Sequence, residues 1–429
     1  MIDRRLLIDE FGPTRDRLLR KLVDPDLIDR ARELLLLSNQ TVAHRDGANT
    51  DLNRVSKEVQ AAKRAGTPDD VMAALLGSAR VLSEAAAVAE QAAREALEAV
   101  ESVLLQLPNL PDDASPDGVS DADNVVVSTS GYDPDNYAGR DWLPHWTLGE
   151  QLGILDIARA TTMSGPMFSM LRGDGARLLY ALVDLGLTLN RDNYVEIVPP
   201  HFVSSNTLKG TGHLPKFADD MYQMTSDDLW AIPTGEVPLT SIHAGEILDL
   251  GDLPKKYMAY TVCWRREAGS AGKATRGMQR LHEFHKVELV HLCAPEQVQG
   301  QFDQLLEDAL RPIQLLGLPY RLVDLCAGDL TFSSTRIFDI EVYAPGSDAW
   351  LEVSSVGIFG DFQPRRNNSR FRRKPGDKPE LLHALNGSAL ATPRVWSAIL
   401  ENYQQPDGTV AVPEVLQRYM GKDRLGNVR

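Results

Sequence analysis

A long run near the amino end, from Pro25 to Gln106, constrains the fold most, because it favours helix everywhere except at one point. That point is Ala65-Gly66-Thr67-Pro68, where a glycine and a proline stand close together. Such pairs end helices and turn the chain. We therefore expect two long helices joined by a short turn, packed against each other as an antiparallel hairpin.

Apolar residues recur along both predicted helices at alternating steps of three and four. In the first they are Leu52, Val55, Val59 and Ala62. In the second they are Val71, Leu75, Leu82, Ala85, Ala89, Ala92, Ala96, Ala99 and Val103, with Ser78 as the one break. This spacing predicts a coiled coil whose small alanine side chains let the two helices approach closely.

Charge distinguishes the two helices of the predicted hairpin. Near the turn the first helix carries four basic residues, Arg54, Lys57, Lys63 and Arg64, whereas the second is mainly acidic. The whole chain has a net charge of -15, which argues against general affinity for polyanions. Nucleic acid would need a local basic surface, and only the first helix offers one. The alternative is that these charges are simply solvated on a helical spacer.

A stretch rich in proline and aspartate, Leu107 to Asp123, follows the hairpin and indicates a domain boundary. We expect a helical arm at 1–106, a connector at 107–145 and a mixed domain at 146–429. Six segments of that domain favour strand: Tyr194–Val198, Tyr257–Trp264, Lys286–His291, Tyr320–Leu325, Phe338–Ala344 and Trp350–Val353. Helices do not alternate regularly with them, so the pattern predicts an α+β fold with an antiparallel sheet flanked by helices.

Several kinds of site are excluded by the sequence. It has neither GxxxxGK[ST] nor GxGxxG after a strand, so any nucleotide phosphate must be held by side chains. Cys263, Cys293 and Cys326 are too widely spaced for a disulfide framework or a CxxC zinc site, and we expect buried thiols. The first residues lack the apolar run of a signal peptide, and we expect a cytoplasmic protein with no membrane segment.

One candidate site surrounds the segment Cys263 to Glu267, which ends an apolar strand. Strand alternation places Arg265 and Glu267 on one face, where a guanidinium can hold an anion and a carboxylate can accept from an amino group. A glycine-rich stretch, Ala268 to Gly277, follows, and then come Arg280 and Phe284. Taken alone, the pattern also fits a surface hairpin with ion pairs.

A second candidate site lies nearer the carboxyl end. Small residues from Asn386 to Ala391 allow close backbone approach, and Arg394 follows at the start of an amphipathic helix. Upstream, alternation sends Glu352 and Ser354 to one face of a strand and Ser355 to the other. Oxygen ligands of this kind suit a magnesium ion that bridges nucleotide phosphates.

Together these motifs resemble class II aminoacyl-tRNA synthetases. Arg265 to Phe284 resembles motif 2 of that class, Asn386 to Arg394 resembles motif 3, and Gly175 to Leu189 with Val198-Pro199-Pro200 resembles motif 1. Eight phrases resemble the seryl-tRNA synthetases in the same order along the chain: Leu107–Pro111, Gly210–Phe217, Ile232–Thr240, Arg266–Ser270, Lys286–Glu288, Asp361–Gln363, Leu385–Ser388 and Val412–Leu416. The resemblance covers essentially the whole chain.

This resemblance implies substrates and roles. The substrates would be L-serine, ATP with Mg²⁺, and tRNA-Ser, whose long variable region the arm would grasp with Arg54, Lys57, Lys63 and Arg64. The residues implied for the serine pocket are Thr234, Glu236, Glu288, Asn386 and Ser388. Arg265 would hold the serine carboxylate and the α-phosphate, Glu267 the adenine amino group and Arg394 the γ-phosphate. Phe284 would stack on adenine.

The resemblance also implies that Glu352 and Ser355 bind magnesium, whereas strand alternation alone points to Ser354. A bend or bulge in the strand would resolve this conflict. The motif 1 helix would pair two copies into a homodimer, and its stripe of Leu178, Leu182, Leu185 and Leu189 is the expected contact.

The sequence departs from the usual family pattern at several positions. His213 and Glu283 replace glutamine, Gly235 alanine, Ala274 and His285 aspartate, Ala327 threonine and Thr331 glycine; Val356-Gly357-Ile358 stands for Cys-Ser-Asn, and Ala389 and Pro393 stand for glycines. These are either ordinary drift or a shift in tRNA docking or amino-acid choice. Besides a serine-charging enzyme, two alternatives stay open: an adenylating paralogue that serves a carrier protein or a specialised pathway, and a non-catalytic tRNA-binding paralogue.

Overall fold

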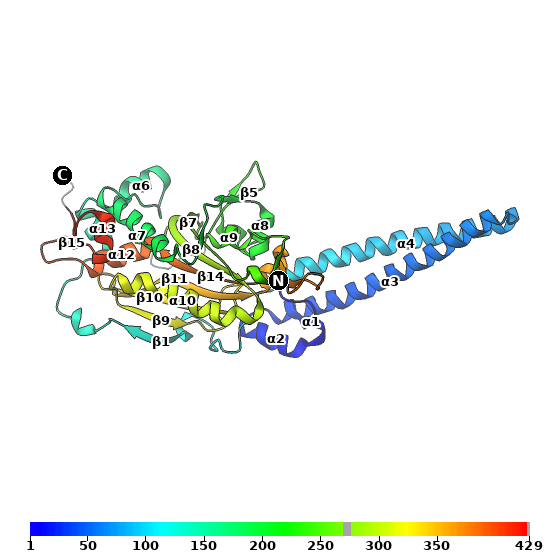
Figure 1. Ribbon diagram of the computed structural model, residues 1–429, viewed down its shortest axis with the longest axis horizontal. Coiled ribbons are helices and arrows are strands. Elements are labelled where there is room, and N and C mark those ends of the chain that lie inside the picture. Colours follow the sequence, from blue (N-terminus) through cyan, green and yellow to red (C-terminus); the bar gives the residue numbers. More distant parts are fainter. Residues whose placement is uncertain (269–275, 427–429) are drawn as a thin grey trace. The chain divides into compact units, whose positions relative to one another are not determined.

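The computed structural model describes residues 1–268 and 276–426. It consists of two compact units, Ile2–Pro108 and Asn109–Arg429, the second of which also includes Met1. We call them the arm and the catalytic unit, and each is described by itself. Figure 1 labels their helices and strands.

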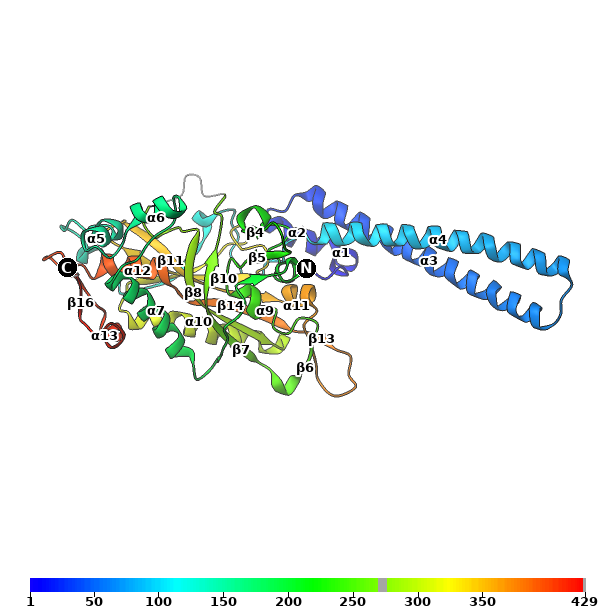
Figure 2. The ribbon, with the colours of Figure 1, turned by 90° about the horizontal axis from the view of Figure 1, so that it is seen from above.

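The arm consists of two short helices, α1 (Leu6–Asp9) and α2 (Phe11–Arg20), and two long ones, α3 (Pro25–Arg64) and α4 (Asp69–Leu104). The side chain of Asp24 caps α3 by accepting from the Asp26 amide at 3.0 Å, and Pro25 occupies the first turn. Gly66 has a φ of 65° in the turn between the long helices. The predicted pair of helices, broken at residues 65–68, is confirmed (Figure 2).

The predicted stripe on α4 is right at six of its nine positions. Of the predicted residues, Val71, Ala85 and Ala92 are exposed, as is the predicted break at Ser78, and six are buried or partly buried: Leu75, Leu82, Ala89, Ala96, Ala99 and Val103. The residues that complete the buried side are Met72, Ala79, Ala86, Ala93 and Val100. The error arose because α4 is apolar at most positions, so two sets of residues one position apart fit the same spacing. The corrected set no longer needs the break at Ser78.

The remaining features of α3 and α4 concern their apolar surface. On α3, Val55 is buried and Leu52, Val59 and Ala62 are partly buried, so the predicted stripe is confirmed there. By length and composition alone α4 is apolar enough to cross a membrane, and it is the one such helix among the described residues. Its packing against α3 accounts for the apolar residues on the facing side of α4.

The catalytic unit is built on an eight-stranded sheet in the order β1-β9-β10-β11-β14-β8-β7-β2. These strands are β1 (Val125–Ser130), β2 (Val195–Glu196), β7 (Lys255–Trp264), β8 (Glu283–Cys293), β9 (Tyr320–Asp324), β10 (Arg336–Ala344), β11 (Ala349–Gly360) and β14 (His383–Ala391). All neighbours pair antiparallel except β2 with β7. The predicted antiparallel sheet and its six predicted strands are confirmed, whereas β1 and β14 were not predicted.

Alternation along β8 divides the sheet into two faces. Val287 and Leu289 point into a core that also contains residues of α7 (Asp174–Asn190), α10 (Val298–Leu315) and α12 (Thr392–Asn402). The residues between them, Lys286 and Glu288, therefore point to the opposite face. That face carries the candidate site.

The other elements are short. The helices are α5 (His145–Gln151), α6 (Ile157–Ser164), α8 (Ser205–Thr211), α9 (Glu236–Thr240), α11 (Phe362–Asn367) and α13 (Glu414–Met420). The small sheets are formed by β3 (Phe202–Val203), β5 (Leu229–Ala231) and β4 (Gln223–Met224), by β13 (Glu380–Leu381), β12 (Arg370–Arg372) and β6 (Ile247–Asp249), and by β15 (Val410–Ala411) with β16 (Arg424–Leu425). All three cysteines are free and buried, as predicted.

The leucine stripe of the motif 1 helix does not form a free surface. Leu178, Leu182 and Leu185 of α7 are fully buried in the core of their own catalytic unit, and Leu189 packs against that core. Expecting these leucines to contact a second copy was therefore wrong. The leucines pack against the chain's own sheet instead, because α7 lies on β8 and β14.

Candidate active site

Arg265 and Glu267 follow directly after the end of β7. The Arg265 Nε donates to the Pro233 carbonyl at 3.2 Å, and its guanidinium carbon lies 5.1 Å from the centre of the Phe284 ring. Glu267 has a φ of 52°, a left-handed conformation that is uncommon outside glycine, and its Oε2 accepts from the Arg280 Nε at 2.7 Å. A polar contact, rather than strand alternation, thus fixes the Glu267 carboxylate.

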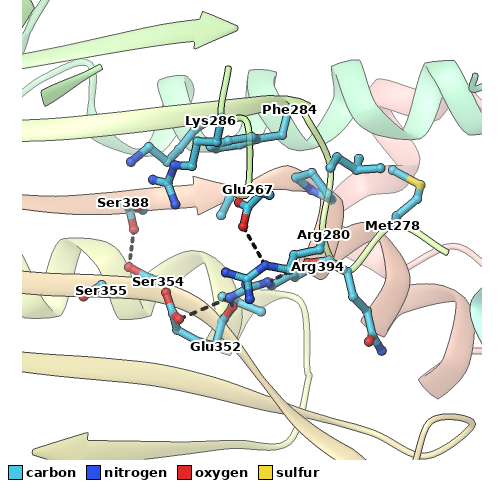
Figure 3. Close-up of a pocket in the computed structure, with 16 residues that line it drawn as sticks. Glu267, Met278, Arg280, Phe284, Lys286, Glu352, Ser354, Ser355, Ser388 and Arg394 are labelled. Atoms are coloured by element: carbon cyan, nitrogen blue, oxygen red, sulfur yellow. Dashed lines mark hydrogen bonds and ion pairs between the residues drawn. The ribbon is translucent and has the colours of Figure 1, made fainter. Parts of the chain in front are cut away.

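These side chains line a first cavity of about 300 Å³ (Figure 3). Its lining is Arg265, Glu267, Met278, Gln279, Arg280, Leu281, Phe284, Lys286, Glu352, Val353, Ser354, Ser355, Ser388, Ala391, Pro393 and Arg394. Three arginines and two carboxylates thus face one space, together with one aromatic ring. This combination suits a ligand that has both anionic groups and a flat ring.

A bulge in β11 settles which serine accompanies Glu352. In the ladder with β10, Ile340 pairs with Ser354 and Glu341 with Glu352, so Val353 is an extra residue. The extra residue reverses the alternation, and Glu352 and Ser355 both line the two cavities of the site. Ser354 is buried, and its Oγ donates to the Ser388 carbonyl at 2.5 Å. The predicted bulge is therefore present.

Arg394 lies in the first turn of α12 and is held by two elements. Its Nη1 donates to the Glu352 carbonyl at 2.7 Å and lies 3.2 Å from the Glu352 carboxylate, while its Nε donates to the Gln279 carbonyl at 3.2 Å. Desolvation would raise the pKa of Glu352, but the charges of Arg394, Arg265 and Lys286 together hold that pKa below its ordinary value. The carboxylate is therefore charged.

A second cavity of about 360 Å³ shares Arg265, Lys286, Glu352, Ser355 and Ser388 with the first. All five residues implied for the serine pocket line it, and all five are buried: Thr234, Glu236, Glu288, Asn386 and Ser388. The sheet positions three of them, because Ser388 of β14 pairs with Glu288 of β8, and Asn386 follows the same face of β14.

Lys286 and Gln363 organise the second cavity, although no role was predicted for either residue. The Lys286 Nζ forms an ion pair with Glu288 and donates to the Thr234 Oγ1 at 2.7 Å, and Thr234 donates to Glu288 at 2.9 Å. The Gln363 Nε2 donates to Glu236 at 2.5 Å. Lys286 and Glu288 are two apart on one strand, and that spacing was the signal available in the sequence.

Burial dominates the ionisation of this cavity. It raises the pKa of Glu288 against the opposing effect of Lys286, and it raises the pKa of Glu236 against its hydrogen bond from Gln363. The two carboxylates therefore bind a proton more readily than exposed ones do. A ligand carrying a positive charge and a hydroxyl would restore the charged forms.

Asp339 of β10 lies beside Glu352 and Ser355 and is a further carboxylate for which no role was predicted. Burial and then the Glu352 charge raise its pKa well above the ordinary value, against a hydrogen bond from Ser355. Its Oδ1 has no hydrogen-bond partner among the described residues. Two adjacent carboxylates and a hydroxyl form a set of hard oxygen donors that fits a divalent cation.

The departures from the family pattern occupy several places. His213, Thr331 and Gly357 line the second cavity. The His213 Nδ1 lies 2.9 Å from the Thr211 Oγ1, and burial lowers the pKa of His213 to about 3. The His285 ring stacks on Tyr260 and is bonded to its hydroxyl at 2.6 Å. Ala274 lies outside the described residues.

The four basic residues of the arm are all exposed. Arg54 pairs with Asp51 at 3.3 Å and Glu58 at 3.2 Å along α3. Among the described residues no ion pair is formed by Lys57, Lys63 or Arg64, so their charges face solvent. Three uncompensated cations near one turn can attract a polyanion.

Both units match models of known protein families. Residues 1–111 match the seryl-tRNA synthetase N-terminal domain, and residues 219–403 match the tRNA synthetase class II core domain (G, H, P, S and T). The serine–tRNA ligases of Pelobacter propionicus and Gemmatimonas aurantiaca are each 42% identical to this chain, over 98% of it and 99% of the relative.

Two solved structures are similar over essentially the whole chain. The seryl-tRNA synthetase of Pyrococcus horikoshii complexed with ATP has a TM-score of 0.93 and 31% identity, covering 100% of both chains. The cytoplasmic serine–tRNA ligase of Naegleria fowleri in complex with AMP has a TM-score of 0.87 and 27% identity, covering 100% of this chain and 99% of that one.

Proposed function

The chain belongs to the seryl-tRNA synthetase family, and on that premise we propose that its two adjoining cavities form one active site. In it the chain activates L-serine with ATP to seryl-adenylate and transfers the seryl group to tRNA-Ser. One observation carries this proposal: Arg265, Lys286, Glu352, Ser355 and Ser388 line both cavities. A molecule in the second cavity can therefore react with one in the first.

Serine occupies the second cavity. Its ammonium group and hydroxyl meet the buried carboxylates of Glu236 and Glu288 and the neutral polar groups of Thr234, Asn386 and Ser388. The positive charge of the ammonium group favours the charged forms of the two carboxylates. A pocket built to bond a hydroxyl rejects alanine, because its buried polar groups would be left without partners. Lys286 fixes the positions of Thr234 and Glu288 before serine arrives.

ATP occupies the first cavity. Phe284 stacks on adenine, Glu267 accepts from the adenine amino group, and Arg280 holds the Glu267 carboxylate in place. Arg394 binds the γ-phosphate. Arg265 lies on the shared wall and binds both the serine carboxylate and the α-phosphate.

The reaction needs no side-chain nucleophile. A serine carboxylate oxygen attacks the α-phosphorus in line, and the bond to the bridging oxygen of pyrophosphate breaks. Arg265 neutralises charge on the crowded phosphate, and Arg394 neutralises charge on the leaving group. The terminal ribose hydroxyl of the tRNA then attacks the serine carbonyl, and AMP leaves.

Glu352 and Ser355 would hold Mg²⁺, with Asp339 beside them. The unpartnered Asp339 Oδ1 and the close pair of carboxylates support this assignment. When bound, the ion would supply positive charge to the phosphates.

The arm and the subunit partner complete the proposal. Lys57, Lys63 and Arg64, with Arg54, bind the phosphates of the tRNA-Ser variable region.

The chain forms a homodimer through the outer side of α7 and β2, where Tyr180, Val195 and Val198 are exposed apolar side chains. The enzyme acts in the cytoplasm, and α4 serves as an arm helix rather than as a membrane segment.

Two assays on the purified chain test this proposal. Serine-dependent exchange of pyrophosphate into ATP, together with charging of tRNA-Ser, is the expected result. Exchange with no charging of tRNA would instead favour an adenylating paralogue that serves a carrier protein. Absence of both, with tRNA binding intact, would favour the non-catalytic paralogue.

A further inference from the structure

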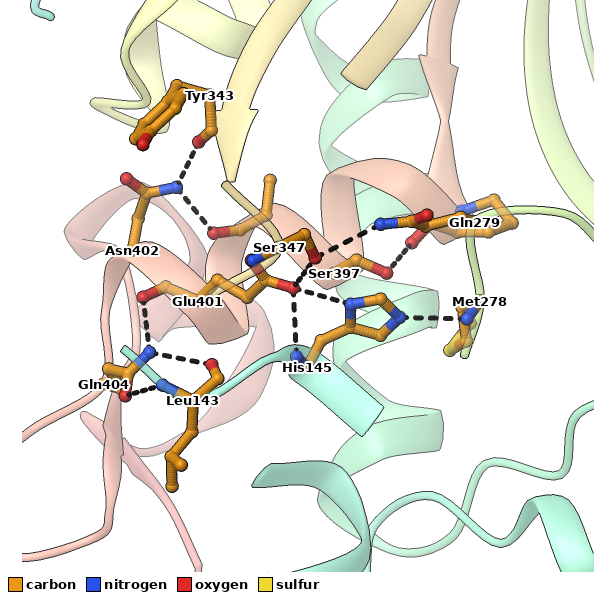
Figure 4. A network of polar contacts seen from close by, with 12 residues as sticks. Leu143, His145, Met278, Gln279, Tyr343, Ser347, Ser397, Glu401, Asn402 and Gln404 are labelled. Atoms are coloured by element: carbon orange, nitrogen blue, oxygen red, sulfur yellow. Dashed lines mark hydrogen bonds and ion pairs between the residues drawn. The ribbon is translucent and has the colours of Figure 1, made fainter. Parts of the chain in front are cut away.

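A network of hydrogen bonds, drawn in Figure 4, includes Met278 and Gln279, two residues that also line the first cavity. Its centre is the pair His145 and Glu401, whose side chains are both fully buried. The His145 Nδ1 lies 2.7 Å from the Glu401 Oε1. His145 comes from the start of α5 and Glu401 from the end of α12, so the pair joins segments far apart in the sequence.

The tautomer of His145 follows from its second contact. The backbone N–H of Met278 donates to the His145 Nε2 at 2.9 Å. A backbone amide can only donate, so Nε2 carries a lone pair and the proton is on Nδ1, which donates to Glu401. The neutral ring thus donates one hydrogen bond to the Glu401 carboxylate and accepts one from the amide of Met278, which lines the ATP cavity.

Glu401 is compensated by neutral donors. Besides the His145 ring, it accepts from the His145 amide at 3.0 Å, from the Ser347 amide at 2.9 Å and from the Ser347 hydroxyl at 2.8 Å. Among the described residues no lysine or arginine forms an ion pair with it. The buried carboxylate therefore depends on each of these donors, because the loss of any one would leave its charge poorly solvated.

A second branch runs from Ser347 to the ATP cavity. The Gln279 Nε2 donates to the Ser347 Oγ at 3.2 Å, and the Gln279 carbonyl accepts from the Arg394 Nε at 3.2 Å. The two branches therefore hold consecutive residues, Met278 by its amide and Gln279 by its side chain. Both residues line the first cavity, as does the next one, Arg280.

Two further features show how closely the chain is held against His145. Gly277 has a φ of 73°, and a Cβ at this position would lie 2.2 Å from the His145 Nε2. Only glycine lets the chain pass there. On the other side, the Gln404 side chain bonds both the amide and the carbonyl of Leu143, at 3.1 and 3.0 Å, and fixes the approach to His145.

We propose that His145, Glu401 and Ser347 are positioning residues for ATP: they hold the segment Gly277–Arg280 so that Arg280 and Arg394 face the nucleotide. The inference rests on the proposed function, since it assigns ATP to the first cavity. The network does not include the residues of the second cavity, so its loss weakens ATP binding and leaves serine binding unchanged.

Two substitutions separate the two hydrogen bonds of the ring. His145→Asn places an amide near the position of Nδ1, so it keeps the bond to Glu401 and loses the bond from Met278. His145→Gln reaches the position of Nε2 and keeps the bond from Met278. We expect His145→Asn to raise the KM for ATP in pyrophosphate exchange about tenfold, as the loss of one buried hydrogen bond predicts. His145→Gln should recover most of that loss.

A control and a gentler variant accompany them. Ser397→Ala removes a buried hydroxyl of α12 that, among the described residues, bonds the Pro393 carbonyl of its own helix at 2.8 Å and no other group, and it should leave both KM values unchanged. Ser347→Ala removes the branch to Gln279 while His145 stays in place, and it should raise the KM for ATP about threefold. It serves where the His145 variants do not fold.

Calorimetry with a non-hydrolysable ATP analogue measures nucleotide binding without catalysis. It therefore tests this inference separately from the proposed activity. A parallel rise in its Kd for His145→Asn is expected. Variants that melt earlier yet keep the KM and Kd of the nucleotide would show a merely structural network and overturn the proposal. An equal rise in the KM for serine would overturn it as well.

Discussion

The middle of the arm's long hairpin and the core of the catalytic unit are packed with side chains of different size. On α4 the best-buried residues away from its end are alanines, Ala86, Ala89 and Ala93, whereas the largest fully buried side chains of the catalytic unit include Trp396, Phe362 and Phe371. Alanines bury little area each, so every turn of the arm depends mainly on the turn facing it. The catalytic unit instead shares one core among three helices and a sheet.

This difference separates two kinds of mutational effect. A change in the arm should act locally and alter only what that part of the hairpin contacts. A change in the catalytic unit should reach the site through strands and networks that several residues share. The predictions below test this contrast, beginning with the largest effect.

Arg265→Ala should abolish adenylate formation. The change removes the cation shared by both cavities, and loss of such a contact in the transition state costs about 3 kcal/mol or more, roughly two orders of magnitude in rate. Pyrophosphate exchange measures it, and circular dichroism should show the arm unaffected. Near-normal exchange would remove Arg265 from the chemistry.

Shortening the arm should affect tRNA alone. Arg45 and Glu90 lie 3.8 Å apart across α3 and α4, so replacing residues 46–89 by a short turn joins facing positions. We expect exchange within about twofold of the intact chain and a KM for tRNA-Ser raised more than about tenfold, because the phosphate contacts are lost. If the short-armed chain charges tRNA normally, the hairpin is only a spacer.

Replacing the four basic residues by alanine should give a milder form of the same defect. The KM for tRNA-Ser should rise, and its dependence on salt should become flatter, because fewer counterions are released. Arg54 should contribute least of the four, since Asp51 and Glu58 already pair with it. A salt dependence equal to that of the unchanged chain would contradict the assigned role.

A pair of neighbouring alanines tests the corrected phase of α4. Ala93 is fully buried and Ala92 is exposed. Ala93→Leu should overpack the hairpin and destabilise the arm by about 1–3 kcal/mol, whereas Ala92→Leu should change little. Thermal unfolding followed by helix signal compares them. The reverse order would restore the stripe first predicted from the sequence.

The smallest effect concerns His213 in the serine pocket. Burial lowers its pKa to about 3, below the ordinary value, so between these two pKa values the unfolded chain takes up a proton that the folded chain refuses. Stability from this group therefore falls as the pH drops through that window. Between about pH 7 and about pH 5 the melting temperature should fall less for His213→Gln than for the unchanged chain. An equal loss would mean that His213 is not kept neutral by burial.

Much of the arm could be predicted because its contacts are local. Spacing of three and four fixed the helices, and Gly66 with Pro68 fixed the turn. The phase of α4 could not be fixed, because the identity of the facing residues decides between two apolar stripes and a single helix does not contain that information.

In the catalytic unit most strands could be predicted, but not all of them and not the contacts between them. Strands rich in branched and aromatic residues were found, but β14 was missed because its small residues, from Asn386 to Ala389, have little strand preference of their own and pair through their neighbours. Lys286, Gln363 and Asp339 were given no role for a related reason. Their significance lies in partners from other strands and helices, which spacing along the chain does not reveal.

The extra residue at Val353 has a consequence for anyone who edits this strand. Deleting Val353 would give β11 a regular ladder with β10 and, by ordinary measures of strand pairing, a better one. The pairing already skips Val353, since Ser354 lies opposite Ile340 and Glu352 opposite Glu341, so this deletion would leave Glu352 and Ser355 on one face and Ser354 on the other. The wrong serine would be presented by a different edit, one that keeps every residue and forces regular pairing, because unbroken alternation places Ser354 and not Ser355 on the face of Glu352.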